Sequence, residues 1–308
     1  MNINNISNIS VVITCYREGD LLYDAINSIL SQTLLPLEII IVNDASSDRR
    51  TIEVCQELEK NSLIQVIWRE VNGGSSVARD LGFAIAQGEI LVPLDGDDIL
   101  PNNAIELISN TFREDNRLGF VYGNYVRQDK INRQKVINPQ DISLREMLRS
   151  KPLSLSSNWK LIGTTPIRKA LWQSLGGYDH SFGINDLHDV EFWIRAIASG
   201  CRYQYIPSVI YVWRKYLGNN SRRVTIDSWQ RIAEKYTSIY QDFGLNYRNY
   251  ELMLLASKWH NDNIQIEYYS QKLRDCLFQG NYRFSTFLIL LLPSFLLRVF
   301  ATFMSQKR

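Results

Sequence analysis

The sequence predicts a doubly wound α/β protein whose central sheet is mostly parallel and whose last part is helical. Short β-branched runs alternate with stretches of helical apolar spacing over residues 10–94. Two of these runs, 38–43 and 89–94, are apolar on both faces, as buried parallel strands are. After residue 223 the pattern becomes mainly helical, which indicates an extension beyond the sheet.

The first hundred residues contain the clearest alternation. Ser10–Cys15 is a short β-branched run, and the stretch after it places Leu22, Ile26 and Ile29 at helical spacing. Turn-prone Asp, Asn, Ser and Gly residues separate the later elements. In order, the expected elements are strand 10–15, helix 20–32, strand 38–43, helix 50–60, strand 63–69, helix 75–87 and strand 89–94.

The alternation weakens beyond residue 100. The expected elements there are helix 102–112, strand 119–127, a polar stretch 130–157 with a helix near 144–149, helix 189–199, strand 203–213, and helices 229–243 and 249–277. We therefore expect a main domain over residues 1–225, a helical extension over 226–280 and an apolar C-terminal segment over 281–308.

Composition is that of an ordinary folded protein, with 308 residues, 45% hydrophobic and 21% charged. A net charge of +2 gives no electrostatic reason to expect a nucleic-acid partner. The four cysteines show no Cys-x-x-Cys spacing, so we expect reduced thiols rather than a zinc site. Residues 1–10 lack the apolar stretch of a secretory signal, so we expect a cytoplasmic location.

Polar groups follow three of the expected strands, at the edge where open α/β sheets bind ligands. They are residues 14–18, residues 44–48 and the acidic cluster Asp95-Gly96-Asp97-Asp98. Three carboxylates so close together repel one another unless a cation is present. Mg²⁺ and Mn²⁺ take one or two protein carboxylates plus substrate phosphates, which this cluster can satisfy. The alternative is a solvated turn in which Asp98 caps the next helix.

Six motifs, in this order, resemble the family 2 glycosyltransferases, which are inverting enzymes of the GT-A fold. The resemblance covers roughly residues 10–221, and its motifs are Val11–Tyr16, Glu38–Asp48, Asn72–Gly82, Leu94–Asp98, Gly176–Asp179 and His188–Arg195. It implies that the enzyme takes a nucleotide-sugar donor and holds the donor's diphosphate through the divalent cation. It also implies that Asp97 is the metal ligand. The residues that it implies for contacts with the nucleotide are Thr14, Tyr16, Glu18, Asp44, Asn72, Gly74, Arg79 and Asp95.

The chemistry of these residue types suits those roles. The carboxylate of Asp44 can accept a hydrogen bond from a ring N–H of uracil or guanine, so UDP-, GDP- and dTDP-sugars stay open as donors. The Gly73-Gly74 pair permits close approach of the backbone, and Arg79 can clamp a phosphate in a bidentate manner. The plainer alternatives are a simple turn at Gly73-Gly74 and a surface helix position for Arg79.

Inverting transfer needs a general base that removes the proton of the acceptor hydroxyl. Asp189 occupies the position of the acidic base in the resembled family, at the start of an expected helix. Glu191 lies two residues further on and is the weaker alternative, as a base or as an acceptor-binding residue. His188 stands where the family usually has a second acidic residue. The alternative for Asp189 is a helix cap.

A basic patch follows the expected strand 203–213, with Arg214, Lys215, Arg222 and Arg223. In related enzymes this stretch closes over the diphosphate, so we expect Arg214 and Arg222 to stabilise the departing nucleotide. Many relatives have a histidine where Tyr216 or Leu217 stands here, which argues against a metal ligand from this loop. A solvated surface loop is the alternative.

The acceptor side should come from the least patterned region, residues 120–185. Candidates with aromatic faces or hydroxyls are Trp159, Thr164, Thr165, Tyr178 and Trp193. Aromatic residues at such spacing are commonly core residues, and we favour that interpretation for Trp193. The expected acceptor is a saccharide or a lipid-linked saccharide.

The segment 284–303 is almost entirely apolar and is divided by Pro293 and Arg298. Its length is nominally enough to cross a bilayer, but an interfacial helix held against anionic lipid fits the flanking cations better. We therefore expect peripheral contact at the inner face of the membrane. The alternative is a terminal helix packed on residues 229–277.

Together these features predict a metal-dependent inverting glycosyltransferase, of the hexosyltransferase type, in polysaccharide or glycan biosynthesis. One alternative is a noncatalytic sugar- or partner-binding protein on a degenerate transferase fold. Another is a sugar nucleotidyltransferase, although the first loop, Thr14–Gly19, lacks the glycines and lysine of a pyrophosphate loop. A dehydrogenase is disfavoured because no Gly-x-Gly-x-x-Gly follows the first strand.

Overall fold

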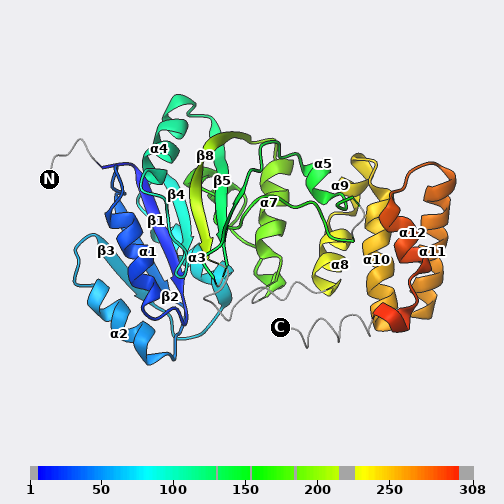
Figure 1. The fold of residues 1–308 in the computed structure, drawn as a ribbon, viewed down its shortest axis with the longest axis horizontal. Helices are drawn as coiled ribbons and strands as arrows, with labels where there is room; N and C mark the ends of the chain where they lie inside the picture. The colour runs from blue at the N-terminus through cyan, green and yellow to red at the C-terminus, as the bar shows by residue number, and fades with distance from the viewer. Residues whose placement is uncertain (1–5, 130, 153–154, 184–185, 215–225, 298–308) are drawn as a thin grey trace. The chain divides into compact units, whose positions relative to one another are not determined.

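A computed structural model describes residues 6–129, 131–152, 155–183, 186–214 and 226–297. The chain forms two compact units (Figure 1). The first takes in residues 1–141 and 161–223, and the second takes in residues 142–160 and 224–308. The segment 142–160 thus leaves the first unit to pack with the C-terminal helices, which the sequence did not predict.

The first unit is built on an eight-stranded sheet in the order β3-β2-β1-β4-β7-β5-β6, with β8 pairing to β5. Strands β1 to β4 pair in parallel with one another, whereas β7 is antiparallel to both β4 and β5. The strands are β1 Ile9–Cys15, β2 Glu38–Asn43, β3 Ile64–Trp68, β4 Ile90–Asp95, β5 Leu118–Gln128, β6 Gln134–Ile137, β7 Ile167–Arg168 and β8 Arg202–Arg214. The prediction of a mostly parallel sheet is confirmed.

Helices cover both faces of this sheet, as Figure 1 shows. They are α1 Leu21–Leu30, α2 Arg49–Leu58, α3 Gly74–Ile85, α4 Ala104–Glu114, α6 Lys169–Ser174 and α7 His188–Ala198. Apolar residues of α1, α2 and α4 share one buried core with alternate residues of β1, such as Val11 and Ile13. The other face of β1 meets α3, where a Cβ on Gly82 would lie 2.3 Å from Val12. Only glycine therefore allows α3 to lie so close to the sheet.

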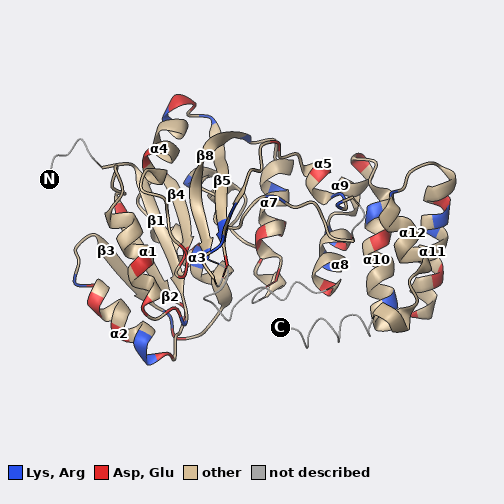
Figure 2. Ribbon diagram, viewed as in Figure 1, with Lys and Arg blue, Asp and Glu red and all other residues tan. Residues whose placement is uncertain are grey.

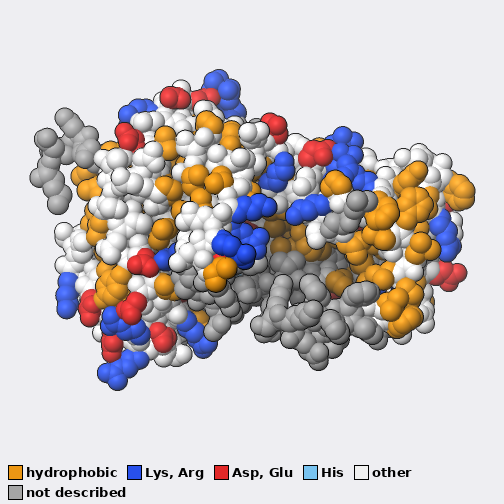
Figure 3. Space-filling model, viewed as in Figure 1, with side chains coloured by type: hydrophobic (Ala, Val, Ile, Leu, Met, Phe, Trp, Pro, Cys, Tyr) orange, Lys and Arg blue, Asp and Glu red, His pale blue; other side chains and the backbone are white. Residues whose placement is uncertain are grey.

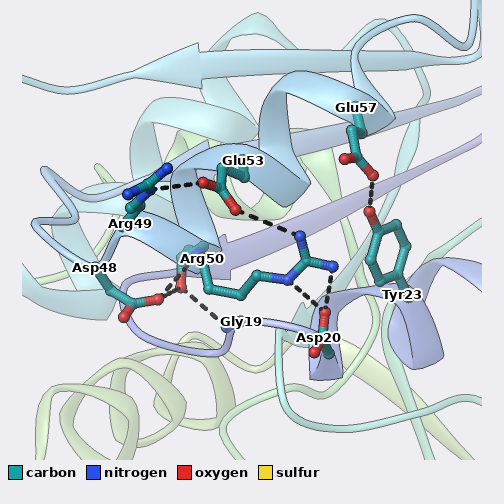
Figure 4. Close-up of polar contacts among 9 residues, drawn as sticks. Gly19, Asp20, Tyr23, Asp48, Arg49, Arg50, Glu53 and Glu57 are labelled. Atoms are coloured by element: carbon teal, nitrogen blue, oxygen red, sulfur yellow. Dashed lines mark hydrogen bonds and ion pairs between the residues drawn. The ribbon is translucent and has the colours of Figure 1, made fainter.

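Polar contacts fix the loop that follows β1 (Figure 4). The backbone N–H of Gly19 donates to the hydroxyl of Thr51 on α2, at 2.9 Å. Arg50 on the same helix bridges Asp20 and Glu53, and its guanidinium lies 2.7 Å from Asp20. These exposed ion pairs contribute little energy, but together with the Gly19 bond they tie the end of this loop to α2.

The second unit is helical. Its helices are α5 Leu144–Leu148, α8 Ile226–Lys235, α9 Thr237–Asp242, α10 Asn246–His260, α11 Asn263–Phe278 and α12 Phe284–Leu291. The central helix α10 is buried on most sides and carries a buried ion pair of 2.9 Å between Arg248 and Glu251. Glu251 also accepts hydrogen bonds from Ser285 and Thr286, which anchor the start of α12.

Most differences from the sequence prediction lie at breaks and in short elements. The single helix expected over 249–277 is wrong, because Asn261 adopts a left-handed conformation and Asp262 caps a new helix. The expected helix 229–243 is likewise interrupted between α8 and α9. The strands β6 and β7 were missed, since one is exposed and polar and the other has two residues. Across the described ranges, no helix is long and apolar enough to span a bilayer.

Candidate active site

The polar groups predicted from sequence meet at one edge of the sheet. Strand β1 lies between β2 and β4, and its register places Thr14 beside both Val42 and Asp95. The chain order reverses here, because β2 and β3 lie on one side of β1 and β4 lies on the other. Ligands of open α/β sheets bind at this switch point, outside the carboxyl ends of the strands.

The loop after β1 carries Tyr16 and Glu18. The carboxylate of Glu18 accepts from the backbone N–H groups of Tyr16 and Arg17, the second at 2.7 Å. Burial raises the pKa of Glu18 despite these bonds. The side chain of Thr14 is buried, and its carbonyl accepts from the N–H of Gly96 at 3.1 Å, which joins this loop to the acidic cluster.

Asp44 follows β2 and is 4% exposed. It accepts from Arg69 and from the backbone N–H groups of Gly73 and Gly74, at 3.1 and 2.7 Å. Asn72 also accepts from Gly74, at 3.1 Å. Asp44 thus holds the turn that begins α3, and Gly74 adopts a φ of +80° that suits glycine. Three donors already occupy most of the acceptor sites of Asp44, which the sequence did not indicate.

Arg69 is a residue that the sequence analysis missed. It directly follows β3, so it lies at the same edge of the sheet as the other predicted residues. Its side chain is 17% exposed and pairs with Asp44. A charged residue at the end of the third parallel strand was the signal that could have identified it.

Arg79 lies one turn into α3 and is 3% exposed, so the surface position considered from sequence is wrong. One of its terminal nitrogens donates to Asp95 at 2.8 Å. Its Nε and Nη1 atoms are buried and find no hydrogen-bond partner among the described residues. Unsatisfied N–H groups of a buried guanidinium are costly, and an anionic ligand group would satisfy them.

The acidic cluster divides into different environments. Asp98 is 1% exposed and accepts from the Tyr211 hydroxyl at 2.6 Å and from the Arg214 backbone N–H at 2.7 Å. No side chain among the described residues donates to Asp97, and burial, with the negative charges of Asp95 and Glu18, raises its pKa to about 7. Charge repulsion of this kind is what a cation at Asp97 would relieve.

The residues around Asp97 fit a metal that takes most of its ligands from a substrate. In the part of the chain that the structure describes, no three His, Cys, Asp or Glu side chains are grouped as a metal cage. Mg²⁺ commonly uses only one or two carboxylates, with phosphate oxygens and waters completing its shell. Asp97 is the carboxylate available for that purpose, since Asp95 is paired with Arg79 and Asp98 is buried.

Arg214 ends β8 and is 7% exposed. Its guanidinium donates to Asp24 of α1 at 2.7 Å and to the backbone carbonyl of Asp97. Arg214 therefore fixes the backbone of the acidic cluster at Asp97, and Asp24 fixes the Arg214 side chain. The sequence did not indicate a role for Asp24. The other predicted cation, Arg222, lies outside the described residues, as do Lys215, Tyr216, Leu217 and Arg223.

The first turn of α7 carries the predicted base. Asp189 is 0% exposed, and its charge acts on both Arg79 and Tyr178. His188 faces α3, where its Nε2 lies 3.3 Å from the hydroxyl of Ser75. Asp189 thus lies on the same side of the sheet as the helix that carries Arg79.

Glu191 is fully buried in a bidentate pair with Arg195, with both N···O distances at 2.8 Å. A carboxylate held in this way is poorly suited to take a proton from a substrate. The structure therefore favours a positioning role for Glu191, and the sequence did not indicate that Arg195 would engage it.

The predicted acceptor residues are distributed between the two units. Thr164, Thr165, Tyr178 and Trp193 belong to the first unit, and Trp159 belongs to the second. Trp193 is 1% exposed and its ring lies 5.0 Å from that of Phe120, so the core interpretation is confirmed. Tyr178 is also buried, and burial raises its pKa to about 12.

Comparison with known proteins identifies one family. Residues 10–181 match the sequence profile of the family described as glycosyl transferase family 2. The glycosyltransferase GlyG of Streptococcus pneumoniae serotype 4 is 27% identical over 242 residues, which cover 76% of this chain and 80% of that protein. The poly-beta-1,6-N-acetyl-D-glucosamine synthase of Staphylococcus epidermidis is 27% identical over 247 residues, covering 76% of this chain but 60% of the synthase.

Solved structures show the same fold. The crystal structure of S. aureus TarS residues 1–349 aligns with a TM-score of 0.55 and 15% identity, covering 86% of this chain and 78% of that chain. A second TarS structure, in complex with UDP-GlcNAc, aligns with a TM-score of 0.54 and 17% identity, covering 79% of this chain and 70% of that chain.

Proposed function

This chain belongs to glycosyl transferase family 2, and we propose that it is an inverting, metal-dependent enzyme that transfers a sugar from a nucleotide-diphosphate donor to a saccharide or lipid-linked saccharide. The observation that carries the proposal is the convergence of Arg79, Asp97 and Asp189. They are a cation whose buried N–H groups lack hydrogen-bond partners among the described residues, a carboxylate with a raised pKa, and a buried carboxylate on α7. A noncatalytic binding protein could use Arg79 and Asp97 to hold the same ligand, but it has no need for a base such as Asp189.

The donor is the first part of the proposal. Arg79 offers its free N–H groups to the diphosphate, while the α3 N-terminal turn at Asn72–Gly74 lets the backbone approach the nucleoside. Thr14 of β1, with Tyr16 and Glu18 of the loop after it, borders the base and ribose, and Asp95 faces the ribose. A TarS structure holds UDP-GlcNAc, which makes UDP-N-acetylhexosamines the first donors to test.

A divalent metal is the second part. We propose that Asp97 holds Mg²⁺ or Mn²⁺, with the remaining ligands supplied by the donor. Such a metal would neutralise the charge that develops on the departing diphosphate. Arg214 keeps the backbone of the acidic cluster in place through its bond to the Asp97 carbonyl.

Transfer then follows a single displacement. Asp189 accepts the proton of the acceptor hydroxyl while that oxygen attacks the anomeric carbon. The new glycosidic C–O bond forms on the face opposite the nucleotide, and the bond from the anomeric carbon to the diphosphate oxygen breaks. The nucleoside diphosphate leaves with the electron pair, and the configuration of the sugar inverts.

The acceptor class rests on the relatives. Among them are synthases of poly-beta-1,6-N-acetyl-D-glucosamine, and a hyaluronan synthase of Pasteurella multocida that is 34% identical over 121 residues. Those residues cover 39% of this chain but only 12% of the hyaluronan synthase, and the first synthase is covered over 60% of its length. We propose a saccharide acceptor in glycan biosynthesis, with the chain's own acceptor to be found by assay.

Membrane contact is the last part. Helix α12 carries no charged residue, as Figure 2 illustrates, and one side of it packs through Ser285, Thr286 and Ile289. The other side exposes apolar residues at i, i+3, i+4 and i+7, namely Phe284, Phe287, Leu288 and Leu291. Hydrophobic side chains gather over this helical unit in Figure 3. Residues 276–308 contain four basic residues and no acidic one, so we propose that this face rests on anionic lipid.

The test uses the purified chain with UDP-, GDP- and dTDP-sugars, each with Mg²⁺, Mn²⁺ or EDTA. We expect one nucleotide class to raise the melting temperature in the presence of metal, because a ligand that binds the native state stabilises it. The same donor should be hydrolysed slowly without acceptor and transferred faster with oligosaccharide acceptors. A complete panel with neither stabilisation nor turnover would refute the proposal.

A further inference from the structure

Asp80, directly after Arg79 on α3, lies in the motif Asn72–Gly82, although the sequence indicated no role for it. Its side chain is 13% exposed and accepts three hydrogen bonds from one stretch of chain far away in sequence. The donors are the Trp172 indole at 2.6 Å, the Tyr178 backbone N–H at 2.9 Å and the His180 ring at 2.8 Å. A single carboxylate thus fixes the start and the end of the segment 172–180.

The backbone of this segment lies directly against the carboxylate. A Cβ atom on Gly177 would lie 2.8 Å from the Asp80 Oδ2 atom, and Gly177 has a φ of +76°. Both observations require glycine at this position, because a side chain would clash and would also strain the backbone. The close approach makes the position of the Gly177–Tyr178 peptide depend on Asp80.

The other side of the same segment is held by α7. Arg195 donates to the carbonyl of Leu175 at 2.7 Å and to that of Gly177 at 2.8 Å. Arg195 is itself fixed by the bidentate contact with Glu191. Residues 175–178 are therefore clamped between Asp80 on α3 and Arg195 on α7.

Tyr178 lies between the two groups on which the proposed reaction depends. Its ring centre is 5.6 Å from the guanidinium carbon of Arg79. The same ring packs on Phe192 at 4.6 Å and meets the ring of His188 at 5.8 Å. Asp189 lies between these two α7 residues in the chain. The Tyr178 ring therefore contacts both Arg79 and the turn of α7 that carries Asp189.

We propose that Asp80 is a positioning residue that sets the distance between Arg79 and Asp189 by fixing Tyr178 between them. The inference rests on the proposed function, since it assigns Arg79 to the diphosphate and Asp189 to the acceptor hydroxyl. Asp80 touches neither substrate. Its effect is on alignment, and a displacement of about 1 Å in an active site can cost about 100-fold in rate.

The test compares Asp80→Asn with Trp172→Phe. The amide of D80N presents an N–H group toward at least one former donor, so it cannot accept all three bonds. W172F removes one donor to Asp80 but leaves the Tyr178 bond and an aromatic ring against Phe83, which now meets Trp172 edge-on at 5.8 Å. We expect D80N to lower kcat between about 10-fold and 100-fold with the donor KM within about threefold, whereas W172F keeps kcat within about threefold.

Hydrogen exchange gives a second measurement that needs no turnover. In D80N, peptides covering 175–182 and 188–192 should exchange faster than in the wild type, while those covering 38–58 should be unchanged. In W172F, the 188–192 peptides should exchange as in the wild type. Unchanged exchange at 188–192 in D80N, or an equal loss of kcat in both variants, would overturn the inference.

The two proposals fail in different ways. If the wild type neither binds nor turns over any nucleotide-sugar, the proposed function is refuted. Hydrogen exchange of the 188–192 peptides still decides, in that case, whether Asp80 controls the first turn of α7. An active wild type with an equally active D80N leaves the function standing and removes the role of Asp80.

Discussion

Arg79 donates a hydrogen bond of 2.8 Å to Asp95 and so joins α3 to the end of β4. The arginine side chain is 3% exposed, whereas that of Asp95 is 43% exposed. The guanidinium of Arg79 is therefore fixed in the interior, whereas the carboxylate that it pairs with is partly exposed to solvent. This geometry leaves Nε and Nη1 of Arg79 free, within the described residues, for an anionic ligand.

Replacing Arg79 by lysine should weaken donor binding more than the retained charge suggests. Lysine cannot keep the bond to Asp95 and also present two N–H groups in a fixed fork. A charge-assisted hydrogen bond contributes about 1.5–3 kcal/mol, so the donor Kd should rise by roughly 10- to 100-fold. Isothermal titration with the donor identified in the panel measures this.

The matched control is Arg49→Lys on α2. The Arg49 side chain is 93% exposed and pairs with Glu53 one turn away, so its replacement should leave the donor Kd within about twofold. Equal donor affinity in R79K and the wild type would contradict a diphosphate role for Arg79.

The sequence predicted which polar side chains meet at this edge of the sheet, because their meeting depends on topology. Thr14, Asp44 and Asp95 lie at or just after the carboxyl ends of three strands that pair in parallel, and such ends meet at the same edge of a sheet. What the sequence could not predict is which of these residues is already engaged. Arg69 meets Asp44 because β3 pairs with β2, and Arg79 meets Asp95 because α3 packs on the sheet.

Arg214 shows the same limit for a single residue. From sequence it begins a basic loop, which suggested a mobile cation over the diphosphate. In the structure β8 continues as far as Arg214, and the backbone bridge between Ile99 and Val212 holds its end against the acidic cluster. The ends of strands are hard to predict from sequence, so the ion pair of Arg214 with the half-exposed Asp24 could not be foreseen.

Replacing Asp189 by asparagine should abolish transfer and spare donor binding. Asparagine has nearly the same shape but cannot take the proton of the acceptor hydroxyl, and a general base contributes about 10²- to 10⁴-fold. Kcat for transfer should fall by that range, while the donor Kd stays within about threefold. A D189N enzyme with wild-type kcat would exclude Asp189 as the base.

Glu191→Gln should instead act on stability. Glu191 is 0% exposed and bidentate with Arg195, so the variant leaves part of a buried ion pair unsatisfied. Breaking such a pair costs about 3–5 kcal/mol in the free energy of unfolding, which urea denaturation measures. A loss of activity with unchanged stability would point back to Glu191 as a base.

The raised pKa of Asp97 predicts how stability depends on pH. Its value of about 7 in the fold lies above the ordinary value of 3.8, so the protonated form is favoured by folding. For metal-free protein this contribution is complete below about pH 4 and is lost as pH rises through 7. Mg²⁺ or Mn²⁺ with donor binds the carboxylate, so ligand stabilisation should increase from pH 6 to pH 8.

Asp97→Asn provides the comparison for that pH series. An amide does not titrate. Between pH 5 and pH 8, the melting temperature of the metal-free variant should therefore fall less than that of the metal-free wild type. Its stabilisation by metal plus donor should be small at every pH. Thermal melts of both proteins in EDTA and in metal measure this, and a wild type that melts at the same temperature across the series would contradict the shift.

The exposed face of α12 predicts lipid binding that depends on both charge and apolar contact. Phe287 and Leu291 are 41% and 80% exposed, so replacing both by glutamate should not disturb the core. The two glutamates remove apolar contact and add repulsion from anionic lipid, so cosedimentation with vesicles of phosphatidylglycerol and phosphatidylcholine should fall about 10-fold or more. The control is Ile264→Glu, at the opposite end of α11 from the turn into α12 and 80% exposed, which should bind nearly as the wild type does. If F287E/L291E and the wild type bind vesicles equally, any membrane contact lies elsewhere in the chain. If F287E/L291E binds as the wild type does and both lose binding only in high salt, charge is the only source of the attraction.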